Sequence, residues 1–144
     1  MSRLEIYGSD MKEIKFRAWD VLNKKMLSWG EVFDLPAWEI FPGTPEQRAF
    51  EVMQYTGLKD RNGKEIYEGD ILEFRANPFN TKRDLFQVVF KDGGFRDEWN
   101  NYIGQYLPPD IRNKQGGRVR LNEVCEVIGN IYKNPELLKE DKNA

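Results

Sequence analysis

The sequence predicts a mainly β protein, a small SH3-like or more complex β-barrel that carries short helices and one long loop insertion. Two hairpin turn sequences, Asp60–Gly63 and Asp92-Gly93, each lie between short runs of alternating apolar and polar residues. The last apolar run, Val124 to Tyr132, is apolar on both alternating faces, as in a central or barrel-closing strand. A chain of 144 residues buries about two-thirds of its unfolded surface, so we expect one domain that needs no metal or disulfide.

The N-terminal third is expected to begin with a hairpin and to continue into an irregular segment. Residues 14–19 alternate with the period of a strand, residues 20–25 turn the chain, and Met26 to Trp29 return it. Residues 30–43 contain two prolines and no sustained period, so we expect a covering loop with one short strand. Thr44 to Gln47 has the pattern of a helix start, with room for about two turns before the chain extends.

The central segment predicts a three-residue hairpin loop. Asp60 suits the first position of a type I turn, and Gly63 suits the left-handed position that closes the loop. This loop places Leu58 opposite Ile66, whereas a two-residue loop ending at Gly63 would place Lys59 opposite Ile66. We prefer the three-residue loop because it keeps two apolar side chains together in the core.

The C-terminal half is expected to continue with short strands. Glu68-Gly69 is a second turn, and residues 70–74 begin a new strand. Residues 85–90 alternate again, and the Asp92-Gly93 turn sets Phe90 opposite Phe95. Residues 97–119 form a long insertion, which is typical of a functional or mobile segment. Asn134 is expected to cap a short final helix that has Pro135 at its first position.

Motifs at both ends and in the centre of the chain resemble the YopX family. They are Lys15–Asp20 with Met26, Tyr55–Leu58, Asp60 with Gly63, Ile66–Ile71, Glu126–Tyr132 and Asn134–Leu138. The resemblance spans roughly residues 11 to 138, although residues 75–122 carry no family motif. It implies a β-barrel-type fold and a phage or prophage origin, and it assigns no reaction.

The resemblance also implies a set of structural motif residues and a domain division. The motif residues are Tyr55, Gly57, Asp60, Gly63, Tyr67, Glu68, Gly69, Asp70, Gly129 and Asn130. Residues 1–10 are interpreted as an N-terminal extension that we expect to be flexible. Residues 11–144 are expected to form a single YopX-like β-barrel domain.

The composition excludes several classes of chemistry. The chain has no histidine, which removes Ser/His and Cys/His nucleophilic pairs and most zinc or iron sites. Its single cysteine, Cys125, fits a reducing cytoplasm and is expected at a buried strand position. No apolar run reaches the roughly 20 residues that span a bilayer, and the N-terminus lacks a signal-peptide core. We therefore expect a soluble protein in the cytoplasm of a bacterial host, without a cofactor.

One group of carboxylates is a candidate for chemistry. Glu65, Glu68, Asp70 and Glu73 lie in one short stretch, and paired carboxylates hold Mg²⁺ or divide acid and base roles in hydrolases. Glu68 and Asp70 also stand at a turn, where carboxylates accept backbone N–H bonds for structural reasons. We favour the structural interpretation, with no catalytic residue and no metal. A metal-dependent hydrolase or nuclease using Glu68, Asp70 and Glu73 is the alternative.

A set of cations is a candidate for nucleic-acid binding, although a net charge of −2 gives no bulk attraction to nucleic acid. These cations fall in two loops and are Arg75, Lys82, Arg83, Arg112, Lys114, Arg118 and Arg120. If the two loops share one end of the barrel, the cations could follow a phosphate backbone while nearby aromatic rings stack on bases. The alternative is two solvated loops whose charges prevent aggregation.

The aromatic residues suggest a contact surface. Four tryptophans and nine phenylalanines exceed what one small core needs, and aromatic side chains are favoured at interfaces. The candidate interface residues are Trp29, Trp38, Trp99 and Tyr102. The alternative is that they fill the barrel interior and its covering loops.

Together these features predict a non-enzymatic accessory protein that acts as a binding module. The partner is expected to be another protein, a second copy of the chain or nucleic acid, and not a membrane. Among these we expect a homo-oligomer.

Overall fold

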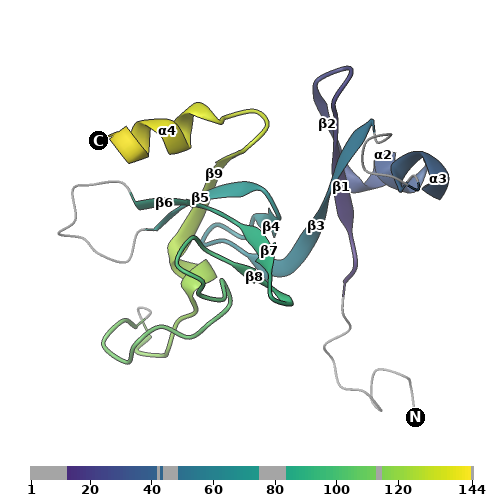
Figure 1. The fold of residues 1–144 in the computed structure, drawn as a ribbon. Coiled ribbons are helices and arrows are strands. Elements are labelled where there is room, and N and C mark those ends of the chain that lie inside the picture. Colours follow the sequence, from purple (N-terminus) through teal and green to yellow (C-terminus); the bar gives the residue numbers. More distant parts are fainter. Residues whose placement is uncertain (1–12, 42, 44–48, 75–83, 113–114, 144) are drawn as a thin grey trace, which may run out of the picture.

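The computed structural model describes residues 13–41, 43, 49–74, 84–112 and 115–143 (Figure 1). Its elements in chain order are β1 (Phe16–Asp20), β2 (Lys25–Leu27), α2 (Trp29–Phe33), α3 (Ala37–Ile40), β3 (Phe50–Lys59), β4 (Glu65–Tyr67), β5 (Asp70–Phe74), β6 (Asp84–Gln87), β7 (Val89–Lys91), β8 (Gly94–Arg96), the 3₁₀ turn η2 (Leu121–Val124), β9 (Cys125–Asn130) and α4 (Glu136–Asn143). The fold is mainly β with a curled half-barrel sheet, which confirms the predicted fold class. The SH3-like arrangement stays a prediction.

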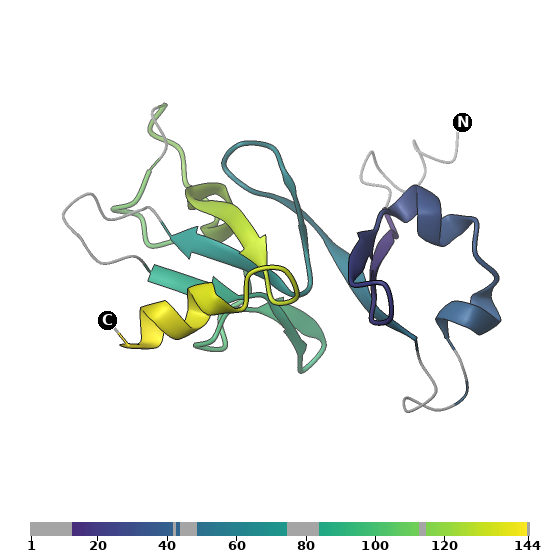
Figure 2. The same ribbon diagram turned by 90° about the horizontal axis from the view of Figure 1, so that it is seen from above.

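The long strand β3 connects two lobes. Its first half pairs with β1, from Phe16 opposite Gln54 to Asp20 opposite Phe50, and its second half pairs with β4. The N-lobe therefore consists of β1, β2, α2, α3 and the start of β3, and the C-lobe consists of the end of β3 with β4 to β9 and α4 (Figures 1 and 2). Each lobe has its own cluster of buried apolar side chains.

The N-lobe has a small core that two short helices cover. Its buried residues are Ala18, Leu27, Val32 and Ile40. Ser28 caps α2, because its Oγ accepts from the N–H of Glu31 at 3.4 Å while the Glu31 carboxylate accepts from the Ser28 N–H at 3.2 Å. Pro36 precedes α3 with the extended backbone of a helix start. The prediction of a loop with one short strand is therefore wrong here, since the capping sequence at Ser28 begins a helix at Trp29.

The C-lobe has the larger core, and β5 is its central strand. The buried residues are Ile66, Leu72, Phe86, Val88, Ile103, Leu107, Val119, Leu121, Cys125 and Val127. The strand order β6-β5-β9 places β9 at the edge of its sheet, so the central position is wrong, and the alternative of a barrel-closing strand stays a prediction. The Asp60–Gly63 turn covers that edge, since the Arg61 N–H donates to the Cys125 carbonyl at 2.9 Å and the Val127 N–H to Asp60 Oδ2 at 3.0 Å. This turn therefore satisfies backbone groups on the outer edge of β9.

The two predicted hairpin turns are confirmed. Lys59 pairs with Glu65, and the Gly63 N–H donates to the Asp60 carbonyl at 3.0 Å, as the three-residue loop requires. The register then shifts between Tyr55 and Lys59, a bulge that we did not predict. The Asp92-Gly93 turn, with positive φ at both residues, sets Phe90 opposite Phe95. Phe90 is 54% exposed although Phe86 and Val88 are buried, because the strand breaks at Val88 between β6 and β7.

The ends of the described chain differ in part from expectation. The Asn134 carboxamide accepts from the Asn130 N–H at 3.2 Å, and α4 begins at Glu136, so Asn134 closes a turn instead of capping the helix. The predicted helix start at residues 44–47 and the extension at residues 1–10 lie outside the described residues. The insertion at residues 97–119 has no strand in its described part, but isolated bridges tie Arg96 to Tyr102 and Arg112 to Arg118. In the portion of the chain with described structure, no helix is long and apolar enough to span a membrane.

Gly69 in the turn between β4 and β5, with Gly63 of the β3–β4 turn as its comparison, tests how much the first turn depends on close packing. Gly63 and Gly69 both have φ of +83°, so alanine at either position is strained by about 1 to 2 kcal/mol. A Cβ at Gly63 meets nothing within 4 Å, whereas a Cβ at Gly69 would lie 3.2 Å from Met53 Sδ and 3.5 Å from Ile131 Cγ1. We predict that Gly69→Ala lowers the free energy of unfolding by about 3 kcal/mol and Gly63→Ala by about 1 kcal/mol. Urea denaturation measures both, and equal losses would contradict the crowding at Gly69.

Candidate functional site

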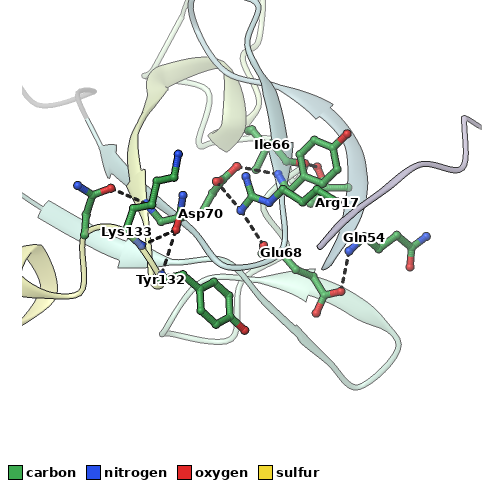
Figure 3. A network of polar contacts seen from close by, with 11 residues as sticks. Arg17, Gln54, Ile66, Glu68, Asp70, Tyr132 and Lys133 are labelled. Atoms are coloured by element: carbon green, nitrogen blue, oxygen red, sulfur yellow. Dashed lines mark hydrogen bonds and ion pairs between the residues drawn. The ribbon is translucent and has the colours of Figure 1, made fainter. Parts of the chain in front are cut away.

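The carboxylate-rich stretch of the sequence lies where the two lobes meet, at the turn between β4 and β5 (Figure 3). In this turn the Tyr67 N–H donates to Asp70 Oδ2 at 2.8 Å. The Gly69 N–H donates to the Val88 carbonyl, and the Gly69 carbonyl accepts from the Ile131 N–H, each at 2.9 Å. The turn therefore joins the β6–β7 break and the segment after β9, and we call this region the joint.

Arg17 of β1 connects the N-lobe to the joint. Its Nη2 lies 2.8 Å from Asp70 Oδ1 and donates to the Glu68 carbonyl at 3.1 Å (Figure 3). Its guanidinium lies over the Tyr67 ring, 4.9 Å from the ring centroid. The Asp70 side chain is 2% exposed and that of Arg17 is 13% exposed. This is a buried ion pair, with one partner from each lobe.

Burial sets the protonation energetics of this ion pair. Loss of solvent raises the pKa of Asp70, and the nearby Arg17 charge and the Tyr67 N–H lower that pKa only in part. Since the folded pKa is above the ordinary value of 3.8, this carboxyl contributes most to stability below pH 3.8. Its contribution declines as the pH rises through the folded pKa. At neutral pH the charged form of Asp70 therefore lowers the stability of the fold, and the Arg17 charge offsets part of this loss.

The neighbouring carboxylates also have partners inside the protein. Glu65 forms an ion pair with Lys15, and Glu68 Oε1 accepts from the Gln54 N–H at 3.0 Å. Glu73 lies half-buried on β5. Across the residues whose placement is described, no three histidine, cysteine, aspartate or glutamate side chains gather as metal ligands do. The arrangement supports the structural interpretation of Glu65, Glu68 and Asp70.

Other motif residues surround the same joint. The Tyr55 and Tyr67 rings lie 5.5 Å apart, and Asn130 Oδ1 accepts from the N–H groups of Tyr132 and Lys133 at 3.0 and 2.9 Å. The Tyr132 ring stacks on Trp19 of β1, with centroids 5.4 Å apart. At Gly129 a Cβ would lie 2.4 Å from the Asn134 carboxamide oxygen. Motif residues from distant parts of the sequence thus hold one contact between lobes, while Gly57, Asp60 and Gly63 shape the β3–β4 hairpin.

A cleft of about 430 Å³ lies beside the joint. Its lining residues are Lys15, Arg17, Met26, Leu27, Ser28, Trp29, Gly30, Glu65 and Tyr67. The two cations in it are paired, Lys15 with Glu65 and Arg17 with Asp70, so the cleft has nearly balanced charge. The aromatic wall at Trp29 belongs to the N-lobe.

The four candidate interface residues do not form one surface. Trp29 and Trp38 lie in α2 and α3 of the N-lobe, whereas Trp99 and Tyr102 lie in the insertion of the C-lobe (Figure 1). Trp99 is 63% exposed and lines a hollow of about 380 Å³. The Arg96 guanidinium lies over the Tyr102 ring, 3.8 Å from the ring centroid. Two further exposed rings of the N-lobe, Phe33 and Phe41, were not among the predicted interface residues, because the helices α2 and α3 that position them were not predicted.

The candidate nucleic-acid residues are placed only in part. Arg75, Lys82, Arg83 and Lys114 lie outside the described residues. Arg112, Arg118 and Arg120 lie in the C-lobe, where the last two flank the Tyr106 ring, each at 4.9 Å from its centroid. The structure brings Arg118 and Arg120 together around one tyrosine, and Arg112 stands opposite Arg118 in an isolated bridge.

The single cysteine occupies the buried strand position that the sequence predicts. Burial raises the pKa of the Cys125 thiol to about 12, with smaller contributions from the Asp97 and Asp60 charges. We predict that native protein does not react with an aromatic disulfide reagent at neutral pH and that urea-unfolded protein reacts with one equivalent. Absorbance of the released thiolate measures this, and rapid reaction of the native protein would contradict the burial.

A double-mutant cycle tests the ion pair between the lobes. Arg17→Met or Asp70→Asn leaves one buried group without its charged partner, so each should lower the free energy of unfolding by about 3 kcal/mol. The double variant should lose at least about 1 kcal/mol less than the sum, because both charges are then gone. Lys15→Met removes a more exposed ion pair and should lower the free energy of unfolding much less. Denaturant unfolding measures all four variants, and additive losses would contradict the coupling.

Comparisons with known proteins agree with this architecture. The structure of protein EF1440 from Enterococcus faecalis is 29% identical, covers 89% of this chain and 99% of its own, and has a TM-score of 0.57. Protein YopX from Bacillus subtilis is 22% identical over 86% of this chain and 95% of its own, with a TM-score of 0.48. No curated protein matches. A family model described as YopX protein matches residues 15–139, and the chain therefore belongs to the YopX family.

Proposed function

We propose that this protein is a phage- or prophage-encoded accessory protein that acts by binding, without a reaction of its own, in the cytoplasm of the bacterial host. Membership of the YopX family supports the origin, because the family resemblance implies phage and prophage genomes. The internal partners of Glu65, Glu68 and Asp70 favour binding over hydrolysis. The observation that carries the proposal is an exposed aromatic surface on the N-lobe.

Four rings of this surface are contiguous. Phe33 packs on Trp29 with centroids 5.5 Å apart, Trp29 on Phe16 at 6.1 Å, and Phe16 on Phe41 at 6.0 Å. Phe33 is 73% exposed and Phe41 51%, and Trp38, three residues before Phe41, is 73% exposed. We call Phe16, Trp29, Phe33, Trp38 and Phe41 the aromatic face. Exposed apolar patches of this kind mark sites of association with other proteins.

The surroundings of the aromatic face are acidic. Residues 28–41 contain Glu31, Asp34 and Glu39 and no lysine or arginine. An apolar centre with a charged rim has the composition of a protein interface. Because the rim charges have one sign, two such rims facing each other repel at low ionic strength, and salt screens that repulsion.

A second copy of the chain is the proposed partner. Each chain has one aromatic face, and a single self-complementary face generates a closed dimer about a two-fold axis. Burying four or five large rings from each copy supplies apolar area, since each aromatic side chain buries about 150–250 Å² when fully covered. The small N-lobe core gains a cover in the same step.

Light scattering after size exclusion tests this proposal. We predict that the wild-type chain forms a dimer that is favoured by higher salt, and that Phe33→Ser/Trp38→Ser is a monomer under the same conditions, because its apolar centre is lost. The matched control is Phe90→Ser/Trp99→Ser, which removes two rings of similar exposure (54% and 63%) from the C-lobe and should remain dimeric.

Two outcomes would contradict the proposal. One is a wild-type monomer at every concentration and salt. The other is a dimer that dissociates as salt rises, because that behaviour would indicate contact between oppositely charged surfaces. Circular dichroism of both double variants establishes that any change in mass is not due to unfolding.

A further inference from the structure

We propose that the C-lobe insertion binds the phosphate backbone of a nucleic acid through a surface formed by Tyr106, Arg112, Arg118 and Arg120. These residues come from two antiparallel segments of the insertion. Tyr106 forms a bridge with Arg120, and Arg112 with Arg118. Bridge partners project to the same side of a ribbon, as do residues two apart such as Arg118 and Arg120. The four side chains therefore share one face, and we call it the arginine face.

Burial confirms which way this face points. Val119, between the two arginines, is 3% exposed and belongs to the C-lobe core. Tyr106 is 52% exposed, Arg112 and Arg118 are exposed, and Arg120 is intermediate. The alternation places the arginine face toward solvent, on the side of the ribbon opposite to the core.

The arginine face concentrates positive charge that no carboxylate of the described residues neutralises in an ion pair. Arg112 stands directly opposite Arg118, and like charges in that position destabilise a strand pair. Among the described residues none of the three arginines forms an ion pair, and the only carboxylate in 106–112 and 115–120 is Asp110. The partners of these arginines within the described residues are the Tyr106 ring and hydroxyl and the Pro109 carbonyl, all of them uncharged. The positive charge of this face therefore remains for a ligand that supplies anions.

Tyr106 holds two of the guanidinium groups in place. The Arg118 and Arg120 guanidinium carbons both lie 4.9 Å from the ring centroid, and Arg120 Nη2 donates to the Tyr106 hydroxyl at 3.2 Å. These contacts leave other guanidinium N–H groups for an anion. Arginine is the side chain best suited to bind phosphate through paired N–H groups.

A nucleic-acid backbone fits this face better than an isolated anion does. Arg118 and Arg120 are separated by two residues of extended chain, about 6.6 Å, with Arg112 beside them across the ribbon. This separation corresponds to about two phosphate steps, since phosphates recur about every 3.4 Å of axis along one strand of a duplex. Because the Tyr106 ring is occupied by the two guanidinium groups, we expect backbone contacts without base readout.

Fluorescence anisotropy with labelled DNA and RNA tests the proposal. The probes are mixed-sequence single-stranded DNA, single-stranded RNA and duplex DNA, each titrated with the full chain over a salt series. We predict binding at low salt that weakens as salt rises and differs little between sequences of one strand type. Arg112→Gln/Arg118→Gln/Arg120→Gln should weaken low-salt binding by at least about tenfold and lower the slope of log K against log salt by about 2.

Three further variants test whether binding depends on this surface or only on the net charge of the protein. Lys25→Gln/Lys91→Gln/Lys139→Gln removes three exposed cations elsewhere and should leave both affinity and salt slope nearly unchanged. Tyr106→Ala keeps every charge but releases the two guanidinium groups, so it should weaken binding several-fold, whereas Tyr106→Phe, which keeps the ring, should weaken it less.

Three outcomes would overturn the proposal. They are no binding to any of the probes at low salt, an equal loss of affinity in the arginine and lysine variants, and binding to a sulfated polysaccharide without binding to nucleic acid. Light scattering on the arginine variant distinguishes this surface from the dimer contact. If the variant no longer forms the dimer and the wild type binds no nucleic acid, the arginines belong to a contact between copies.

Discussion

The ion pair between Arg17 and Asp70 is the interaction on which the arrangement of the two lobes depends. It is nearly inaccessible to solvent, and its partners come from β1 and from the turn that begins β5. The same turn bonds to Gln54 of β3, to Val88 and to Ile131. Two parts of the C-lobe, the strand shared by both lobes and one strand of the N-lobe therefore meet within four residues. An ion pair in this position is a weak source of stability, because desolvation opposes the attraction, but a buried charge without its partner is costly. The pair therefore disfavours any arrangement of the lobes that separates its two members.

This dependence explains why a stretch rich in carboxylates has structural partners. Asp70 binds Arg17 and the Tyr67 N–H, Glu65 binds Lys15, and Glu68 binds the Gln54 N–H. Each carboxylate fixes a different pair of segments, so they do not point to a common centre. A metal-binding or acid–base site needs the opposite, two or more carboxylates that converge on one point.

The sequence predicted those parts of the fold that local chemistry determines. Asp60 with Gly63 and Asp92 with Gly93 form their hairpins because positive φ and short-range hydrogen bonds decide a turn within four residues. The edge position of β9 was not predictable in the same way, since the turn that bonds to this edge lies 67 residues earlier in the chain, where Asp60 Oδ2 accepts from the Val127 N–H. The partner of Arg17 is Asp70, which lies 53 residues later in the chain. Whether the two side chains meet depends on how β3 positions one lobe relative to the other. The short helices α2 and α3 were missed because their caps span only a few residues, and with them the exposed rings of Phe33 and Phe41.

A net charge of −2 conceals a separation of charge between the lobes that matters for association. The segment 28–41 of the aromatic face carries only acidic charges, and the arginine face has three arginines beside one carboxylate. Higher salt favours contact between two aromatic faces, because it screens the repulsion between their acidic rims. Higher salt weakens binding at the arginine face, because it weakens the attraction between a cationic surface and phosphate. The continuous strand β3, the buried ion pair and the Trp19–Tyr132 stack join the lobes that carry these surfaces. Two copies joined through their N-lobes would therefore present two arginine faces at a fixed separation, and one nucleic acid held by both would be bound more tightly than by either alone.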